Sequence, residues 1–241
     1  MLSLLYQDDY LVVVNKPSGM LVHRSWLDKH ETQFVMQTLR DQLGQHVYPV
    51  HRLDRPTSGA LVFALDSINA RRLSEQFEQH MVQKTYLAVV RGIIDECGVI
   101  DYALKSRFDK IADKFSDTTK APESALTYYQ RLATTEQPFV SCKRFNSSRY
   151  SLVALTPVTG RKHQLRRHMK HIFHPIVGDT TYGDKVQNRA MLAYVGVQRL
   201  LLHAHRLSLM HPVTQHNLTI TAPVDEAFGQ LLTAFEWQKA V

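Results

Sequence analysis

The chain has 241 residues, of which 44% are hydrophobic, and it contains ten glycines and nine prolines. This composition is typical of a folded globular protein and excludes disordered, collagen-like and low-complexity chains. With 29 Lys and Arg against 22 Asp and Glu, the formal net charge is +7. Such an excess favours an anionic partner, either a nucleic acid or a membrane surface.

The two cysteines and the first residues bear on the compartment. Cys97 and Cys142 form no C-x-x-C pattern, so we predict neither a disulfide framework nor a cysteine-rich zinc module. Residues 1–17 lack the basic start of a signal peptide, and the apolar run at 11–14 is too short to span a membrane. We therefore expect a cytoplasmic protein that does not associate with a membrane.

The first part of the chain predicts strands and one helix. Apolar runs on either side of Asp8-Asp9 predict a strand, a turn and a second strand, with another turn at 16–19. Met36, Leu39 and Leu43 mark one face of a helix that ends at Gly44, because glycine readily takes the left-handed conformation of a C-cap.

Strands and helices remain intermixed further along the chain, which predicts a mixed α/β or α+β fold. No Gly/Ser-rich or Pro-rich linker divides the sequence, so we expect one domain over 1–241. The later elements are a strand at 47–51, a loop at 52–59, a strand at 60–65, a helix with Leu73, Phe77 and Met81 on one face, a strand at 84–90, an exposed polar excursion at 105–124, strands at 200–209 and 218–221, and a helix with Phe228, Leu231, Leu232 and Phe235 on one face.

The positive charge is concentrated in residues 137–178, which hold eight Lys and Arg and no Asp or Glu. The spacing of Leu165, Met169 and Ile172 predicts a helix that begins near Thr159. Lys162, Arg166 and Lys170 fall on an adjoining face of that helix. Arg161 and Lys162 would lie in its first turn, where the helix dipole disfavours each cation by roughly 0.3 to 1 kcal/mol. Either a bound phosphate or an internal carboxylate would offset this cost; a solvated basic face is the alternative interpretation.

Common catalytic motifs are absent: the sequence has no G-x-G-x-x-G, P-loop, H-E-x-x-H or G-x-S-x-G. Four histidines lie in the basic segment, at positions 163, 168, 171 and 174, but the neighbouring cations would repel a metal dication. His203, His205 and His211 could also chelate, although packing and hydrogen bonding are the more common roles of such residues. We predict no metal site.

A short polar loop, His51 to Gly59, places Asp54 between Arg52 and Arg55 and between two apolar strands. Catalytic groups are often mounted on such loops, and nearby positive charge would keep the carboxylate ionised for use as a nucleophile or a general base. A carboxylate that only caps the following turn is the alternative.

The pattern H-R-L-D-x-x-T-S-G in this loop resembles the catalytic signature of the RluA-type pseudouridine synthases. The resemblance continues in family order over nearly the whole chain, at 13–19, 84–86, 159–166, 178–183 and 202–204. It implies a pseudouridine synthase fold: a central mixed, mainly antiparallel sheet flanked by helices and loops, with the active-site cleft across the sheet. It also implies isomerisation of uridine in RNA without a cofactor or a metal.

The resemblance implies roles for individual residues. Asp54 matches the essential catalytic residue, which either attacks C1′ of the ribose or takes a proton from C2′. Tyr86 matches the tyrosine that stacks on uracil and is a candidate to help remove the C5 proton, although a core tyrosine fits the same strand pattern. Arg166 matches the arginine paired with the catalytic carboxylate, with Arg161 a weaker candidate for that pairing or for a phosphate. Arg52 matches the residue that enters the RNA stack where the target base leaves.

The remaining basic residues are candidates for phosphate contacts. The RNA-binding set is Arg52, Arg55, Arg161, Lys162, Arg167 and Lys170. Position 162 is Lys where many relatives carry Thr or Ser, so the start of the helix is less well capped.

Two further stretches, at 22–28 and 109–115, resemble a member of the family that modifies uridine 65 in the T stem of tRNA. We therefore expect a tRNA substrate, a monomeric catalytic domain and no N-terminal S4-type domain. A synthase for ribosomal RNA and a non-catalytic RNA-binding module are the alternatives. A membrane-surface role is the weakest, since no amphipathic helix pairs aromatic residues with the basic face.

Overall fold

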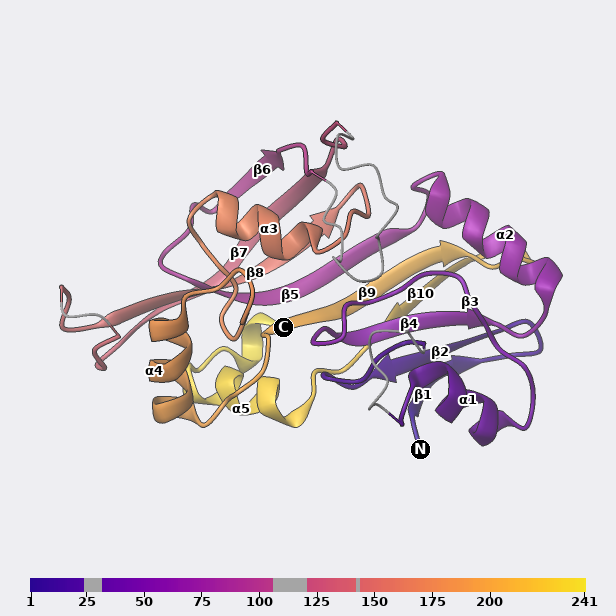
Figure 1. Ribbon diagram of the computed structural model, residues 1–241, viewed down its shortest axis with the longest axis horizontal. Helices are drawn as coiled ribbons and strands as arrows, with labels where there is room; N and C mark the ends of the chain where they lie inside the picture. The colour runs from indigo at the N-terminus through magenta and orange to yellow at the C-terminus, as the bar shows by residue number, and fades with distance from the viewer. Residues whose placement is uncertain (24–31, 106–120, 142–143) are drawn as a thin grey trace.

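One mixed β-sheet organises the computed structural model, which describes residues 1–23, 32–105, 121–141 and 144–241 (Figure 1). Within these residues, the strand order is β1-β2-β4-β9-β5-β8-β7-β6, with β10 beside β9 and β3 beside β4. The parallel pairing joins β4 to β9 at Ser58 and Gly59, and the other strand pairs are antiparallel. The predicted mixed, mainly antiparallel sheet is confirmed.

The bounds of the elements are as follows. The strands are β1 Ser3–Gln7, β2 Leu11–Lys16, β3 Tyr48–Pro49, β4 Ser58–Ala64, β5 Gln83–Arg91, β6 Cys97–Asp101, β7 Leu126–Gln137, β8 Ser148–Pro157, β9 Leu202–Met210 and β10 Asn217–Thr221. The helices are α1 Val35–Leu43, α2 Ser67–Glu78, α3 Gln164–His171, α4 Lys185–Val195, α5 Glu226–Ala234 and the short 3₁₀ helix η1 Gln238–Ala240.

Helices cover both faces at each end of the sheet. At the end formed by β1 to β4, side chains of β2 alternate: Val12 packs in the cluster that contains Leu39 of α1, and Val13 packs in the cluster that contains Leu73 of α2. At the other end, Met169 of α3 belongs to a cluster on one face and Phe228 of α5 to a cluster on the opposite face. Burial on both faces explains the continuous apolar runs of the central strands.

The predicted elements are present, with shifted boundaries. Strand β4 begins at Ser58, inside the predicted loop. Helix α2 ends at Glu78, so Met81 lies beyond it and is 54% exposed. Strands β6, β7 and β8 and helix α4 were not predicted. Residues 106–120 of the predicted excursion lie outside the described residues; at its base, Leu104 pairs with Glu123. No helix in the described part of the chain is long and apolar enough to cross a membrane.

The start of the basic helix was wrong in the prediction. Helix α3 begins at Gln164, because His163 takes a left-handed conformation (φ 57°) at the N-cap and residues 162–163 form a turn. Arg161 and Lys162 therefore precede the helix, and the cations of its first turn are instead Arg166 and Arg167.

Candidate active site

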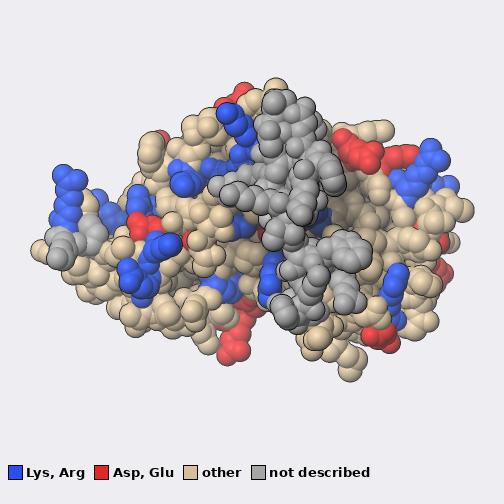
Figure 2. All heavy atoms as spheres, in the orientation of Figure 1, with Lys and Arg blue, Asp and Glu red and all other residues tan. Residues whose placement is uncertain are grey.

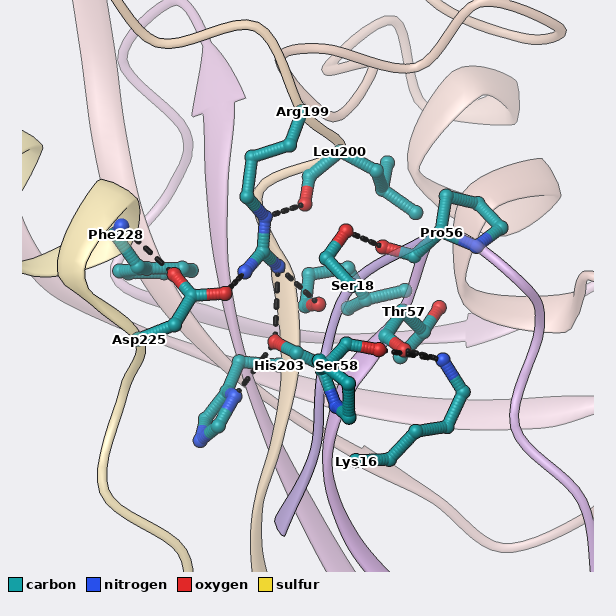
Figure 3. Close-up of polar contacts among 12 residues, drawn as sticks. Lys16, Ser18, Pro56, Thr57, Ser58, Arg199, Leu200, His203, Asp225 and Phe228 are labelled. Carbon is teal, nitrogen blue, oxygen red and sulfur yellow. Dashed lines mark hydrogen bonds and ion pairs between the residues drawn. The ribbon is translucent and has the colours of Figure 1, made fainter. Parts of the chain in front are cut away.

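A buried lysine binds the backbone of the loop that carries Asp54. The Nζ atom of Lys16 donates to the backbone carbonyls of Pro17, Arg55 and Thr57 at 2.8, 3.0 and 2.8 Å (Figure 3). Lys16 is fully buried, and this burial, with the nearby charge of Arg199, lowers its pKa to about 7. Two of its three acceptors, the carbonyls of Arg55 and Thr57, lie one and three residues after Asp54 in the chain. Lys16 therefore fixes the backbone that presents the carboxylate.

A second polar network ties the end of the loop to the C-terminal part of the chain. Arg199 donates to the hydroxyl of Ser58 at 2.9 Å and pairs with Asp225, whose carboxylate caps α5 (Figure 3). The Ser58 hydroxyl also contacts Nδ1 of His203 at 2.8 Å. At Gly59 (φ 114°), a Cβ atom would lie 2.3 Å from the carbonyl oxygen of Ala204, so this close approach of β4 to β9 requires glycine.

The predicted pair of Asp54 and Arg166 is present, but Arg166 has a closer partner. Its Nη1 lies 3.2 Å from Oδ2 of Asp54, while its Nε and Nη2 donate to both oxygens of Asp179 at 2.7 and 2.8 Å. Arg166 is 4% exposed and Asp179 1%. Burial opposes the charge of Arg166, yet its bonds to Asp179 and the charge of Asp54 outweigh this effect and raise its pKa. Arg166 is thus a fixed cation, and it does not belong to an exposed row with Lys162 and Lys170.

Asp179 was not predicted as a member of the site. Its carboxylate accepts backbone N–H groups of Thr181 and Tyr182 in addition to the fork of Arg166. Burial favours the neutral acid, but these bonds prevail and lower the pKa of Asp179. One feature of the sequence could have indicated Asp179: it is the first acidic residue after the acid-free segment 137–178. It also follows Gly178, where a Cβ atom would clash with the carbonyl of Arg199.

Asp54, Tyr86 and Arg166 line one cavity of about 220 Å³, together with Leu53, Thr57, Lys84, Pro157, Leu202 and residues 159–165. Since these residues come from β4, β5, β8 and β9 or from the segments that adjoin them, the cavity crosses the middle of the sheet as predicted. Burial and the charge of Asp54 raise the pKa of Tyr86. The phenol packs against two core clusters and also faces the cavity, which reconciles the two roles considered for it.

The structure divides the predicted RNA-binding residues into two groups. Arg52, Arg161 and Lys162 line the cavity, whereas Arg55, Arg167 and Lys170 lie outside it. Arg161 pairs with Glu123 at 2.7 Å, so its suggested pairing with Asp54 is wrong. The Nε atom of Arg55 donates to the carbonyl of Gly19 at 2.9 Å.

The histidines considered as metal ligands have other contacts. His168 is buried between the hydroxyl of Thr127 and the carbonyl of Tyr102, and His174 contacts the carbonyl of Arg91. His203 and His205 both contact the carbonyl of Ala222, and His211 contacts Asp8 at 2.6 Å. Within the described residues, no three His, Cys, Asp or Glu side chains are placed to hold a metal ion.

Some residues on which the sequence predictions depend lie outside the described residues. This applies to Lys143 of the basic segment, to Cys142, and to most of the two stretches at 22–28 and 109–115 that resemble a tRNA-modifying member of the family.

Comparison with known proteins defines the class. The family model for RNA pseudouridylate synthase matches residues 10–171, so the chain belongs to the RNA pseudouridylate synthase family. The solved structures of Human RNA Pseudouridylate Synthase Domain Containing 1 and Domain Containing 4 are each 28% identical to it, with TM-scores of 0.71 and 0.69. They match 98% and 97% of this chain over 95% and 93% of their own. The predicted fold and enzyme class, a pseudouridine synthase, are confirmed.

More similar relatives carry a more specific name. The tRNA pseudouridine synthase C of Pasteurella multocida (strain Pm70) is 63% identical over 98% of this chain and 97% of its own length. The protein of the same name from Vibrio cholerae serotype O1 is 58% identical over 100% of this chain and 98% of its own.

Proposed function

We propose that the chain converts a uridine of tRNA to pseudouridine, at position 65 in the T stem. The observation that carries this proposal is the Asp54 carboxylate, bound by Arg166 at 3.2 Å, in a cavity that also contains Tyr86. The names of the relatives that are about 60% identical over nearly the full chain support tRNA as the substrate.

The reaction rearranges the bonds of one nucleotide. The C1′–N1 bond breaks, uracil turns in the cavity, and C5 bonds to C1′; C5 then loses its proton and N1 gains one. Asp54 acts on the ribose, either by attack on C1′ or by removal of the C2′ proton, and both routes need an ionised carboxylate. Arg166, itself fixed by Asp179, holds one oxygen of Asp54 and leaves the other directed toward the cavity.

The cavity lies within the protein surface, so the target nucleotide must leave the RNA stack to reach it. Flipping a base costs a few kcal/mol, and Arg52, which is exposed at the cavity, occupies the space that the base vacates. Tyr86 stacks on the flipped uracil. Arg55, Arg161, Lys162, Arg167 and Lys170 bind phosphates, and Figure 2 shows Lys and Arg side chains gathered over the region of α3.

The proposal also includes a monomeric protein that acts in the cytoplasm, where its tRNA substrate is found.

The test uses the purified protein with an unmodified tRNA transcript that carries 5-tritiated uridine. We expect tritium release and a pseudouridine mapped to position 65, and no product from a transcript with cytidine there. A product at another tRNA position, or one formed only in ribosomal RNA, would contradict the assignment of the substrate. Binding without tritium release would contradict enzyme activity.

A further inference from the structure

His163 lies at the N-terminus of α3 in a strained backbone conformation. It is the N-cap residue, where Ser, Thr, Asp or Asn is favoured because these side chains accept a backbone N–H. The imidazole makes no such bond; Oε1 of Gln164 accepts from the hydroxyl of Thr159 and the backbone N–H of Arg161 instead. A residue other than glycine in the left-handed region costs on the order of 1 kcal/mol, and such strain concentrates at functional sites.

The strained backbone places the imidazole in the cavity beside the catalytic carboxylate. His163 lines the cavity, and its Nε2 lies 3.9 Å from Oδ1 of Asp54, the oxygen that Arg166 does not bind. Its Nδ1 contacts the hydroxyl of Tyr182 at 2.9 Å, and the two rings meet edge to face. The guanidinium of Arg166 lies 5.1 Å from the centre of the Tyr182 ring. The hydroxyl of Tyr182 therefore orients the ring of His163, and the ring of Tyr182 in turn packs against Arg166.

The proposed reaction needs a group that accepts the C5 proton, and few side chains of the cavity can do so. Arg52, Arg161 and Arg166 are cations, and Asp54 is engaged at the ribose. Lys84 also lines the cavity and burial lowers its pKa, but in the described part of the chain the groups beside the Asp54 carboxylate are His163 and Arg166, not Lys84. Tyr86 remains a neutral phenol, since burial and the charge of Asp54 raise its pKa, and a neutral phenol is a very weak base.

The electrostatic surroundings of His163 keep it unprotonated at neutral pH. Burial is the main cause that lowers its pKa, and the positive charges of Arg166 and Lys162 act in the same direction. The negative charges of Asp54 and Asp179 oppose this shift without reversing it. A neutral imidazole presents a lone pair, so His163 can take a proton where Tyr86 cannot.

We infer that His163 is the base that removes the proton from C5 after the C1′–C5 bond has formed. The inference rests on the proposed function and adds a catalytic residue to it. When C5 attacks C1′, N1 forms a double bond to C6. The imidazole then takes the C5 proton, the electron pair of the C–H bond re-forms the C5–C6 double bond, and the electron pair of the C6–N1 double bond returns to N1. The imidazolium then protonates N1. Exchange of this N–H with water releases the hydrogen to solvent.

The test compares single-turnover rates on RNA that carries either uridine or 5-deuterated uridine at the target position. In the variant His163→Gln we expect a rate on the order of 10²- to 10⁴-fold lower, as for the loss of a general base, and a larger deuterium isotope effect, because deprotonation of C5 becomes rate-limiting. The acid limb of the pH–rate profile, which reports protonation of His163, should also disappear. His171→Gln, on the exposed side of the same helix, is the matched control and should match the wild type in rate and isotope effect.

Two outcomes would overturn the inference: a His163→Gln rate within about threefold of the wild type, or a lower rate with an unchanged isotope effect, which would indicate only a structural role. Melting temperatures of both variants separate loss of folding from loss of chemistry. If the wild-type protein formed no pseudouridine in any RNA, the proposed function would be at fault rather than the role of His163.

Discussion

The two sides of the Asp54 loop are held by different kinds of interaction. On the cavity side, Arg166 binds the carboxylate itself and is in turn held by Asp179. On the opposite side, Lys16 binds backbone carbonyls, and Arg199 binds the hydroxyl of Ser58 (Figure 3). The cavity side thus holds the Asp54 carboxylate and the opposite side holds only the backbone of the loop, so substitutions on the two sides should have separable effects on rate and on stability.

The largest effect is expected on the cavity side, from Arg166→Met. Loss of a fixed cation beside the reacting group should lower kcat by about 10² to 10³, and the unpaired, buried Asp179 should cost about 3 to 5 kcal/mol of unfolding free energy. The double variant Arg166→Met with Asp179→Asn should recover much of the stability, because no buried charge is left, and none of the rate. Urea unfolding and single-turnover kinetics measure both quantities; recovery of activity in the double variant would contradict the role of Arg166.

On the opposite side, Lys16→Met should alter stability in a pH-dependent way. Folded Lys16 loses its proton near pH 7, whereas the unfolded chain keeps it up to a pKa of about 10.4. Between these values the unfolded state binds more protons, so Lys16 makes the wild type more stable as pH rises, by at most roughly 1.4 kcal/mol per pH unit. The difference in unfolding free energy between wild type and Lys16→Met should therefore grow in favour of the wild type from pH 7 to pH 10. A difference that stays constant over this range would show that burial does not depress the pKa of Lys16.

Asp225→Asn should have a smaller effect, because the amide still accepts the N–H of Phe228 at the start of α5. The substitution removes the charge partner of Arg199, whose side chain is 10% exposed, and should cost about 1 to 3 kcal/mol. We expect a lower melting temperature with kcat within about threefold of the wild type. A much larger loss of kcat at full folding would mean that the two sides of the loop are not separable.

The smallest effects concern RNA affinity. Arg167→Gln and Lys170→Gln should each reduce the slope of log K against log salt by roughly 0.7 to 0.9, the value for one phosphate contact, and leave kcat at saturating RNA unchanged. Arg71→Gln, on α2 at the other end of the sheet, is the control, since its side chain is 84% exposed and pairs with Glu75. Equal slopes for all three variants would show that α3 is not part of the RNA-binding surface.

Local patterns in the sequence predicted most of the strands and helices, because the alternation and spacing of apolar residues report burial directly. Strand β7 was not predicted. More buried and more exposed residues alternate along much of it, but there is no clear apolar period in its sequence, L-T-Y-Y-Q-R-L-A-T-T-E-Q. The start of α3 was misplaced because Thr159 is a favourable N-cap residue, and nothing local shows that His163 would take this position in a left-handed conformation.

The residues predicted as catalytic lie in three separate motifs of the sequence. Asp54, Tyr86 and Arg166 came from the family resemblance, and the structure brings all three to one cavity. Asp179 and Lys16 were missed as parts of the site, although both lie in motifs that resemble the family, because their partners are 13 and about 40 residues away in the chain. A buried charge with a distant partner leaves no local pattern. The available sign was that Lys16 lies only two residues after the apolar run at 11–14.

The central claim, that the carboxylate of Asp54 performs the chemistry, is tested most directly by Asp54→Asn in a single-turnover assay of tritium release from 5-tritiated uridine in tRNA. The amide keeps the size of the side chain and its place beside Arg166 but has no ionised oxygen. We predict that the variant binds tRNA with nearly the affinity of the wild type and releases no tritium. Tritium release by this variant at the wild-type rate would contradict the account.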